Sequence, residues 1–167
     1  MPGVSRASVY RIYPGKAALF GALLAAEAPF AAISAMLRRH HDDPPSVVLP
    51  MLLSTMQREA APRVGILRAL MFEVYDGTPD AVEAAHWTLR PMALEVSAYL
   101  AAQMDAGAIR RMHPVLAAEA LIGPLVFFLF TRSVAAPLAG LEVEPEVAAQ
   151  TFAGIALRGL APQPIEE

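Results

Sequence analysis

Residues 3–20 read GVSRASVYRIYPGKAALF and contain the most specific pattern in the chain. Ser5 can cap a short helix that follows it, and Pro14-Gly15 ends that helix. Lys16 then lies in the first turn of the next helix, where free backbone N–H groups and the helix dipole also attract phosphate. The stretch therefore predicts a short helix at about residues 5–12, a turn and a second helix.

Several side chains in this stretch carry hydrogen-bond donors that suit the phosphates and base edges of DNA. They are Arg6, Ser8, Tyr10, Arg11 and Tyr13. On composition alone, a solvated basic helix end explains these residues equally well. The chemistry of the stretch therefore indicates DNA contact but does not distinguish it from an ordinary surface.

Charge is distributed unevenly along the chain. Residues 1–41 hold five basic residues against one acidic residue, whereas residues 42–167 hold eight against fifteen, and the formal net charge is −3. A basic end on an acidic body predicts that the N-terminal end meets a polyanion while the rest has another task.

The composition excludes several classes of protein. With 56% hydrophobic and 17% charged residues, the chain is too apolar to be disordered, and its 167 residues suffice for a buried core. The absence of cysteine excludes disulfides, thiolate metal sites and cysteine nucleophiles. The longest uncharged runs, 44–57 and 120–131, are shorter than the roughly 18 to 20 residues of a bilayer span, and no secretory leader is recognisable. We therefore expect a cytoplasmic protein without a membrane span.

Alanine, proline and glycine predict an all-α fold. The chain is rich in alanine and shows little apolar/polar alternation, and its prolines and glycines lie where helices could begin and end. The predicted helical segments are residues 5–12, 15–40, 45–59, 62–76, 79–106, 114–136 and 145–159. Prolines inside these segments are expected to kink or interrupt them. These prolines are Pro29, Pro50, Pro91 and Pro124.

Two predicted helices have informative faces. In segment 79–106, apolar residues recur at spacings of three and four, which indicates an amphipathic helix. Segment 114–136 has almost no polar face, so it needs packing from more than one side, which a chain of this size rarely supplies. We therefore predict a homodimer in which segments 114–136 and 145–159 meet a second subunit; the alternative is the central helix of a monomeric bundle. The predicted interface residues are Leu121, Leu125, Phe128, Arg132, Phe152 and Ile155.

Residues 3–20 closely resemble the turn, recognition helix and following helix of the TetR (tetracycline-repressor) family of transcriptional regulators, whose motif is G-V-S-x-x-T/S-L/V-Y-x-H/Y-F-x-x-K-x-x-L. The resemblance implies a helix-turn-helix head that places residues 5–8 at the major groove. It also implies phosphate contacts for Ser8, Tyr10 and Lys16. Together, the chemistry and the resemblance assign the following residues to DNA: Ser5, Arg6, Ala7, Ser8, Tyr10, Arg11 and Lys16.

The rest of the chain is similar to the family in layout. The implied parts are a partial helix-turn-helix domain at residues 1–28, a helical effector-binding and dimerisation domain at residues 29–160, and a tail at residues 161–167. The chain departs from the family pattern at Ile12, where the family has His or Tyr, and at Gly15, where it has Ser or Thr. These departures bear on DNA affinity.

Family members carry a first helix and the first helix of the helix-turn-helix ahead of the position of Gly3. This chain has no counterpart of these elements, which normally support the recognition helix. We therefore expect the chain by itself to bind duplex DNA weakly and without sequence preference. A form with the helix pair is expected to bind a pseudo-palindromic operator tightly.

In the family, the C-terminal domain binds a small molecule among its middle helices, and the helix that corresponds to residues 15–40 transmits the change to the DNA-binding heads. Residues 45–106 hold methionine and aromatic side chains that suit such a cavity, with His86 and Arg90 as polar anchors, although such side chains are more often core than ligand contacts. The candidate effector-binding residues are Met71, Phe72, Tyr75, His86, Trp87, Arg90 and Tyr99.

Signals for metal binding and catalysis are weak. Residues 40–43 read HHDD and could chelate, but neighbouring side chains point to different sides of a helix, so a solvated helix end is favoured. No nucleophile elbow, phosphate loop, His-Glu-x-x-His or dinucleotide motif occurs. We therefore expect no metal, no cofactor and no enzymatic activity.

The sequence thus predicts a homodimeric, all-α, DNA-binding transcriptional regulator, a repressor that a small apolar or aromatic effector releases from its operator. The alternative is a dimeric all-helical small-molecule-binding module that does not bind DNA in this form. In-frame codons for a helix pair ahead of Met1 would favour the first.

Overall fold

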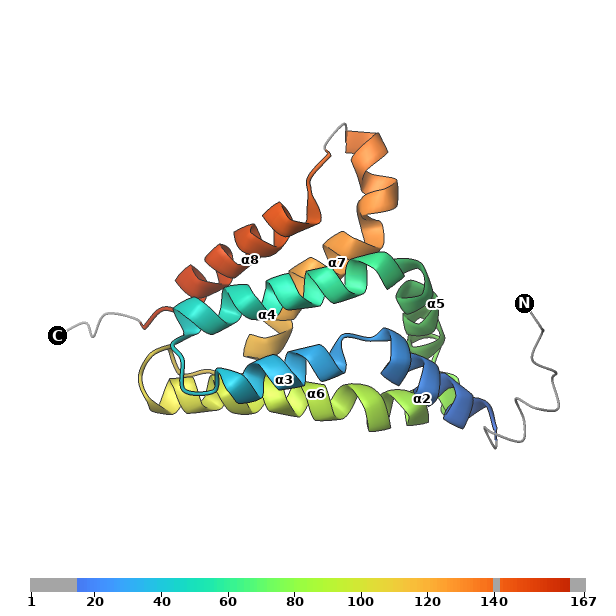
Figure 1. Ribbon diagram of the computed structural model, residues 1–167, viewed down its shortest axis with the longest axis horizontal. Helices are drawn as coiled ribbons and strands as arrows, with labels where there is room; N and C mark the ends of the chain where they lie inside the picture. The colour runs from blue at the N-terminus through green and yellow to red at the C-terminus, as the bar shows by residue number, and fades with distance from the viewer. Residues whose placement is uncertain (1–14, 140–141, 163–167) are drawn as a thin grey trace.

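The computed structural model describes residues 15–139 and 142–162, which form an all-helical bundle (Figure 1). The helices are α2 (Lys16–Glu27), α3 (Phe30–Arg39), α4 (Pro45–Ala60), α5 (Val64–Tyr75), α6 (Pro79–Asp105), α7 (Pro114–Ala139) and α8 (Pro145–Leu160), with a 3-10 turn at Ala61–Arg63. This described part of the chain contains no strand. The all-α prediction is confirmed, whereas the helix predicted at residues 5–12 lies outside the described residues.

Proline begins four of the helices, as the sequence predicts. Pro45, Pro79, Pro114 and Pro145 are the first residues of α4, α6, α7 and α8. A proline at this position costs the helix no hydrogen bond, because the N–H groups of the first turn have no partner within the helix. The helix predicted from residue 62 begins at Val64 instead, after the 3-10 turn.

The segment predicted at residues 15–40 consists of two helices. α2 ends at Glu27 and α3 begins at Phe30, and the two helices are bent by 52° at this break. Pro29 lies in the break and cannot donate a backbone hydrogen bond there. The other internal prolines lie within α4, α6 and α7, which continue past them. The expected interruption therefore occurs at Pro29 alone of these four positions.

The helices pack around one core. α4 lies along α8, α2 and α3 lie along α6, and α7 packs against both α6 and α8 (Figure 1). The largest side chains with under 2% exposure in this part of the chain include Ile33 of α3, Leu49, Leu52 and Leu53 of α4, Leu100 of α6, and Leu121 and Leu125 of α7. α6 thus contributes to the core at one end and supports α2 along its length.

α7 is the most apolar helix of the described chain. Its Pro114–Ala135 stretch is long and apolar enough to cross a membrane, with a mean hydropathy of 1.9 over its most apolar window, and the bent α2–α3 pair would pass the same test as one further span. Only 28% of that α7 window is buried inside the chain. Because core and interface helices share this length and composition, the expectation of no membrane span stays a prediction.

Candidate functional site

A cleft of about 520 Å³ lies between α6 and α7, beside the end of α5. We call it the α6–α7 cleft. It is lined by residues that include Tyr75 of α5, Met92 and Ser97 of α6, and Ile122, Gly123 and Val126 of α7. Its volume lies within the range of roughly 300 to 1,000 Å³ that is typical of small-molecule sites.

The wall of the α6–α7 cleft offers few polar groups. Thr131 also lines it, but the Thr131 hydroxyl donates a hydrogen bond to the backbone oxygen of Phe127 at 2.7 Å. Glu119 is exposed, and no basic side chain of the described residues lines the cleft. The cleft therefore suits an apolar guest better than an ion.

Ser97 is the unusual residue of this wall. The residue is 7% exposed, and its Oγ is buried and has no hydrogen-bond partner. Among the described residues, this Oγ is the one buried side-chain oxygen or nitrogen in that state. A serine inside a helix can bond to the backbone oxygen one turn earlier, yet here it does not. An unpaired buried hydroxyl costs about 1 to 3 kcal/mol.

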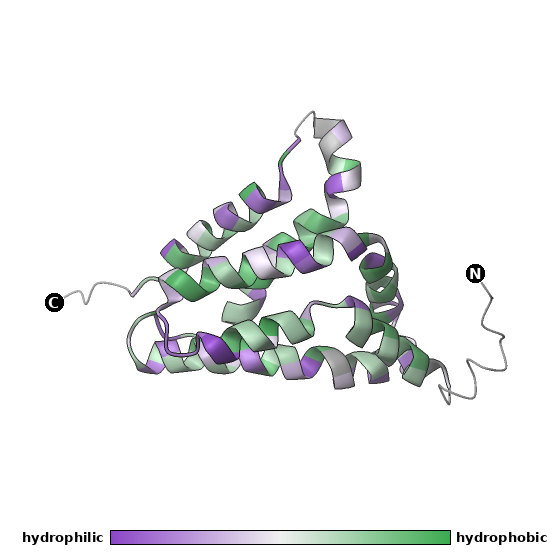
Figure 2. Cartoon of the chain, in the orientation of Figure 1, coloured by the Kyte–Doolittle hydropathy of each residue, from purple (hydrophilic) through white to green (hydrophobic). Residues whose placement is uncertain are grey.

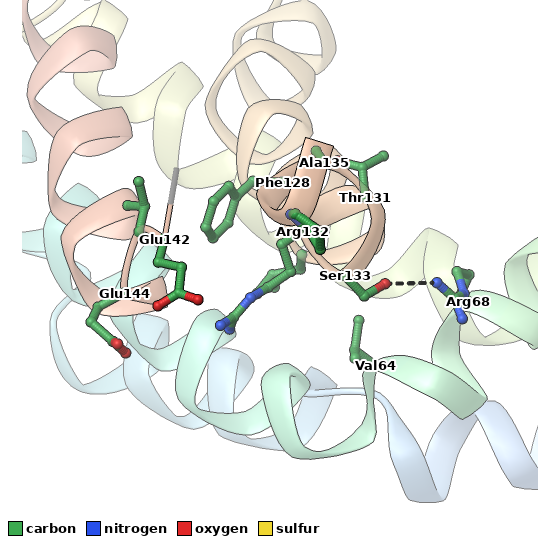
Figure 3. A pocket seen from close by; sticks show the side chains of 12 residues that line it. Val64, Arg68, Phe128, Thr131, Arg132, Ser133, Ala135, Glu142 and Glu144 are labelled. Atoms are coloured by element: carbon green, nitrogen blue, oxygen red, sulfur yellow. Dashed lines mark hydrogen bonds between the residues drawn. The ribbon is translucent and has the colours of Figure 1, made fainter. Parts of the chain in front are cut away.

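A second cleft, of about 810 Å³, lies between α5, the second half of α7 and residues 142–144 (Figure 3). We call it the Arg68–Arg132 cleft. The guanidinium of Arg132 lies 6.0 Å from the ring centroid of Phe128, and Arg68 donates to the backbone oxygen of Phe130 at 3.3 Å. Glu142 and Glu144 contribute carboxylates to the same cleft (Figure 3). This cleft is charged, with two groups of each sign.

The predicted effector residues do not converge on one cleft. Tyr75 lines the α6–α7 cleft, whereas Trp87 is 72% exposed and contacts the ring of His86 edge-on, with centroids 5.7 Å apart. Neither of these two clefts is lined by Met71, Phe72, His86, Trp87 or Arg90. Tyr99 also lines neither cleft and packs in the core, where it is 7% exposed. Its assignment to an effector cavity stays a prediction that these two clefts do not support.

Tyr99 ties α6 to the loop between α3 and α4. Its hydroxyl donates a hydrogen bond to the backbone oxygen of Asp43 at 2.9 Å. Burial, with a further contribution from the Asp43 carboxylate, raises the pKa of Tyr99 to about 12. The hydroxyl therefore keeps its proton, and the hydrogen bond, over the physiological range.

The predicted DNA contacts fall largely outside the described residues. Ser5, Arg6, Ala7, Ser8, Tyr10 and Arg11 lie there, and so does the side chain of Lys16. Lys16 is the first residue of α2, and Gly15 precedes it with a φ of 120°. Residues with a side chain rarely adopt this backbone conformation, whereas glycine adopts it readily. The departure from the family pattern at Gly15 therefore has a local backbone reason.

The predicted interface residues differ in how far the chain itself buries them. Leu121 and Leu125 are 1% and 0% exposed, so their assignment to a contact with a second subunit is wrong: the chain buries them itself. Phe128 and Phe152 are half-buried and pack edge-on against each other within the chain, with centroids 6.2 Å apart. Ile155 is 53% exposed and remains available to a partner.

The predicted interface residues omit three exposed apolar residues on one side of α7. Leu116, Phe127 and Val134 are 56%, 70% and 60% exposed. Their spacings of 11 and 7 residues correspond to about three and two helical turns, which places them on one side of α7. On α8, Val147 and Ile155 are likewise exposed, at 55% and 53%. We call these five residues the α7–α8 stripe.

The HHDD sequence at the end of α3 forms local pairs. His40 Nδ1 lies 2.7 Å from an oxygen of Asp43, and His41 Nε2 lies 2.9 Å from an oxygen of Asp42. In the described part of the chain, no group of three or more His, Asp or Glu side chains could hold a metal ion. The residues present therefore supply no metal centre there.

Comparison with known proteins adds no relative. No protein-family model, no curated protein and no solved structure matches this chain. The resemblance to TetR regulators therefore rests on the sequence alone, chiefly on residues 3–20.

Proposed function

We propose that this chain is a TetR-like transcriptional regulator, a repressor that leaves its operator when a small apolar effector occupies the α6–α7 cleft. The observation that carries the proposal is the continuity of residues 3–20 with α2. That stretch resembles a recognition helix and its following helix, and α2 lies along α6, which lines the cleft. α2 and α6 together thus connect the DNA-binding end with the effector site.

α6 supports the transmission step. It is a single helix of 27 residues that contacts α2 and α3 and places Met92 and Ser97 in the cleft wall. Packed interfaces switch between arrangements rather than deform continuously, because protein interiors are close-packed. A ligand that moves α6 relative to α7 would therefore move α2, and with α2 the DNA-binding end.

A second copy of the chain is the proposed partner of the α7–α8 stripe. The five residues of the stripe are apolar and exposed, which suits contact with a partner, and most oligomers pair identical surfaces about a two-fold axis. A two-fold dimer would also present two DNA-binding ends to two half-sites of a pseudo-palindromic operator. The stripe thus supports the homodimer, and Ile155 belongs both to the stripe and to the predicted interface.

Gel-shift titration tests this function. A form that carries a helix pair ahead of Gly3 is titrated onto DNA from upstream of its own gene, with and without an apolar ligand. We expect salt-sensitive, site-specific binding that the ligand weakens, and Tyr10→Ala and Lys16→Ala should weaken binding across sequences. Dimerisation and ligand binding without DNA affinity in this form would contradict the proposal and favour the alternative of a ligand-binding module.

A further inference from the structure

We propose that the α6–α7 cleft takes an uncharged, largely hydrocarbon molecule whose one hydrogen-bonding oxygen pairs with the Ser97 hydroxyl. Alcohols, phenols and ketones of one or two rings belong to this class. The inference rests on the proposed effector site and names the chemistry of its ligand.

The size and hydration of the α6–α7 cleft favour an apolar ligand. The cleft of about 520 Å³ is much larger than the space of roughly 30 Å³ that one water molecule takes in the liquid. A buried water needs two to four polar partners, and this wall supplies few. Water in the cleft is therefore poorly held, and an apolar molecule gains by displacing it.

The charges of the side chains that line the α6–α7 cleft disfavour an ionic ligand. A buried anion needs a cationic partner, and among the described residues no His, Lys or Arg lines the α6–α7 cleft. Glu119 is the one carboxylate in the lining, and it is exposed. An anion would be repelled by Glu119, and a cation would gain little from a solvated carboxylate. Arg68 and Arg132 line the other cleft.

Ser97 can form the hydrogen bond to the ligand oxygen. The Thr131 hydroxyl is already engaged with the backbone oxygen of Phe127, whereas Ser97 Oγ is unpaired and covered. Since no hydrogen bond holds Ser97 Oγ, rotation about the Cα–Cβ bond can turn it toward the cleft without breaking one. A hydroxyl both donates and accepts, so it recognises a single ligand oxygen of either type. Ser97 is therefore the specificity-determining residue of the cleft.

Calorimetric titration with three matched probes tests the ligand class. The probes are naphthalene, 1-naphthol and 1-naphthoate, which share one ring system and differ in a single group. We expect 1-naphthol to bind the chain at least about tenfold more tightly than 1-naphthoate, since the anion finds no partner. We expect Ser97→Ala to weaken 1-naphthol about fivefold and to leave naphthalene within about twofold.

Two control variants locate the effect. Thr55→Val removes a buried hydroxyl of α4, outside the cleft lining, and should leave all three affinities unchanged. Gly123→Leu should abolish binding of 1-naphthol and naphthalene, because Gly123 lines the cleft and an added Cβ there meets open space. This variant keeps the helix and fills the site.

The outcomes separate the inference from the function on which it rests. Equal weakening of 1-naphthol and naphthalene by Ser97→Ala, or tight binding of 1-naphthoate, would overturn the ligand class. Binding of no probe by the folded chain, or loss of the dimer in Gly123→Leu, would overturn the cleft as a ligand site. All titrations use the chain without DNA, so a failure of DNA binding affects the proposed function alone.

Discussion

Two halves of this bundle differ in how far their apolar side chains are exposed. The closed half comprises α3, α4, the inner side of α8 and the end of α6, where Leu49, Leu52 and Leu100 are all 0% exposed. The open half comprises α5, the first two thirds of α6 and the outer sides of α7 and α8, where Trp87 and Phe127 are 72% and 70% exposed. Hydrophobic residues run over both halves (Figure 2). The two halves differ in how many helices cover them, and under the proposed function a ligand and a second copy cover the open half.

The largest expected effect compares two leucines of α6. Leu100 is 0% exposed in the closed half, and Leu94 is 51% exposed in the open half. Leu100→Ala should lower the free energy of unfolding by about 3 kcal/mol, because it leaves a cavity. Leu94→Ala should lower it by less than about 1 kcal/mol. Urea denaturation measures both, and equal losses would erase the distinction between the halves.

Association should depend on the α7–α8 stripe. Ile155→Asp should weaken the dimer by about 2 kcal/mol or more, because it places a charge in an apolar contact. The monomer should keep its fold, since Ile155 is 53% exposed. Gln150→Glu adds the same charge to α8 beside Glu146, which bonds to Ser54 of α4, and should leave the dimer intact. Sedimentation velocity distinguishes the variants, and an unchanged Ile155→Asp dimer would remove the stripe from the interface.

Alkaline pH should weaken the closed half through Tyr99. The folded chain binds the Tyr99 proton more tightly than the unfolded chain, since its pKa is raised from 10.0 to about 12. The stabilisation is therefore fully present below pH 10 and is lost as the pH rises toward 12, by about 2 kcal/mol in total.

Tyr99→Phe provides the control for this titration. It should cost about 1 kcal/mol at neutral pH through the lost hydrogen bond to Asp43, and should lack most of the alkaline decline. Urea denaturation at a series of pH values measures this. A decline of the same size in the variant would assign the titration to other groups.

The smallest expected effect concerns the single tryptophan. Trp87 is 72% exposed and does not line the α6–α7 cleft. Trp87→Ala should change the free energy of unfolding by less than about 0.5 kcal/mol and should leave 1-naphthol affinity unchanged. Loss of 1-naphthol binding in this variant would restore Trp87 to the effector site that the sequence predicts for it.

Local chemistry explains what the sequence predicts well. Proline at the first helical turn sets the beginnings of α4, α6, α7 and α8, and Pro29 separates α2 from α3. These positions depend on backbone donors and sterics within a few residues. The all-α class and most helix boundaries follow from such local rules.

The orientation of each helix depends on its neighbours and could not be predicted in the same way. α7 is apolar on nearly every side, so its sequence does not indicate which side faces the core. The prediction that Leu121 and Leu125 meet a partner fails for this reason, because the chain buries both residues itself. Tyr99 and Tyr75 look alike in sequence, but one meets the Asp43 oxygen 56 residues away and the other is exposed. The unpaired state of Ser97 likewise arises only from packing.

Multi-angle light scattering at micromolar concentration tests most directly the claim that a second copy completes the open half. We expect the mass of two chains, falling toward one on dilution of the Ile155→Asp variant but not of the parent chain. A parent chain that has the mass of one chain throughout the micromolar range would contradict the account.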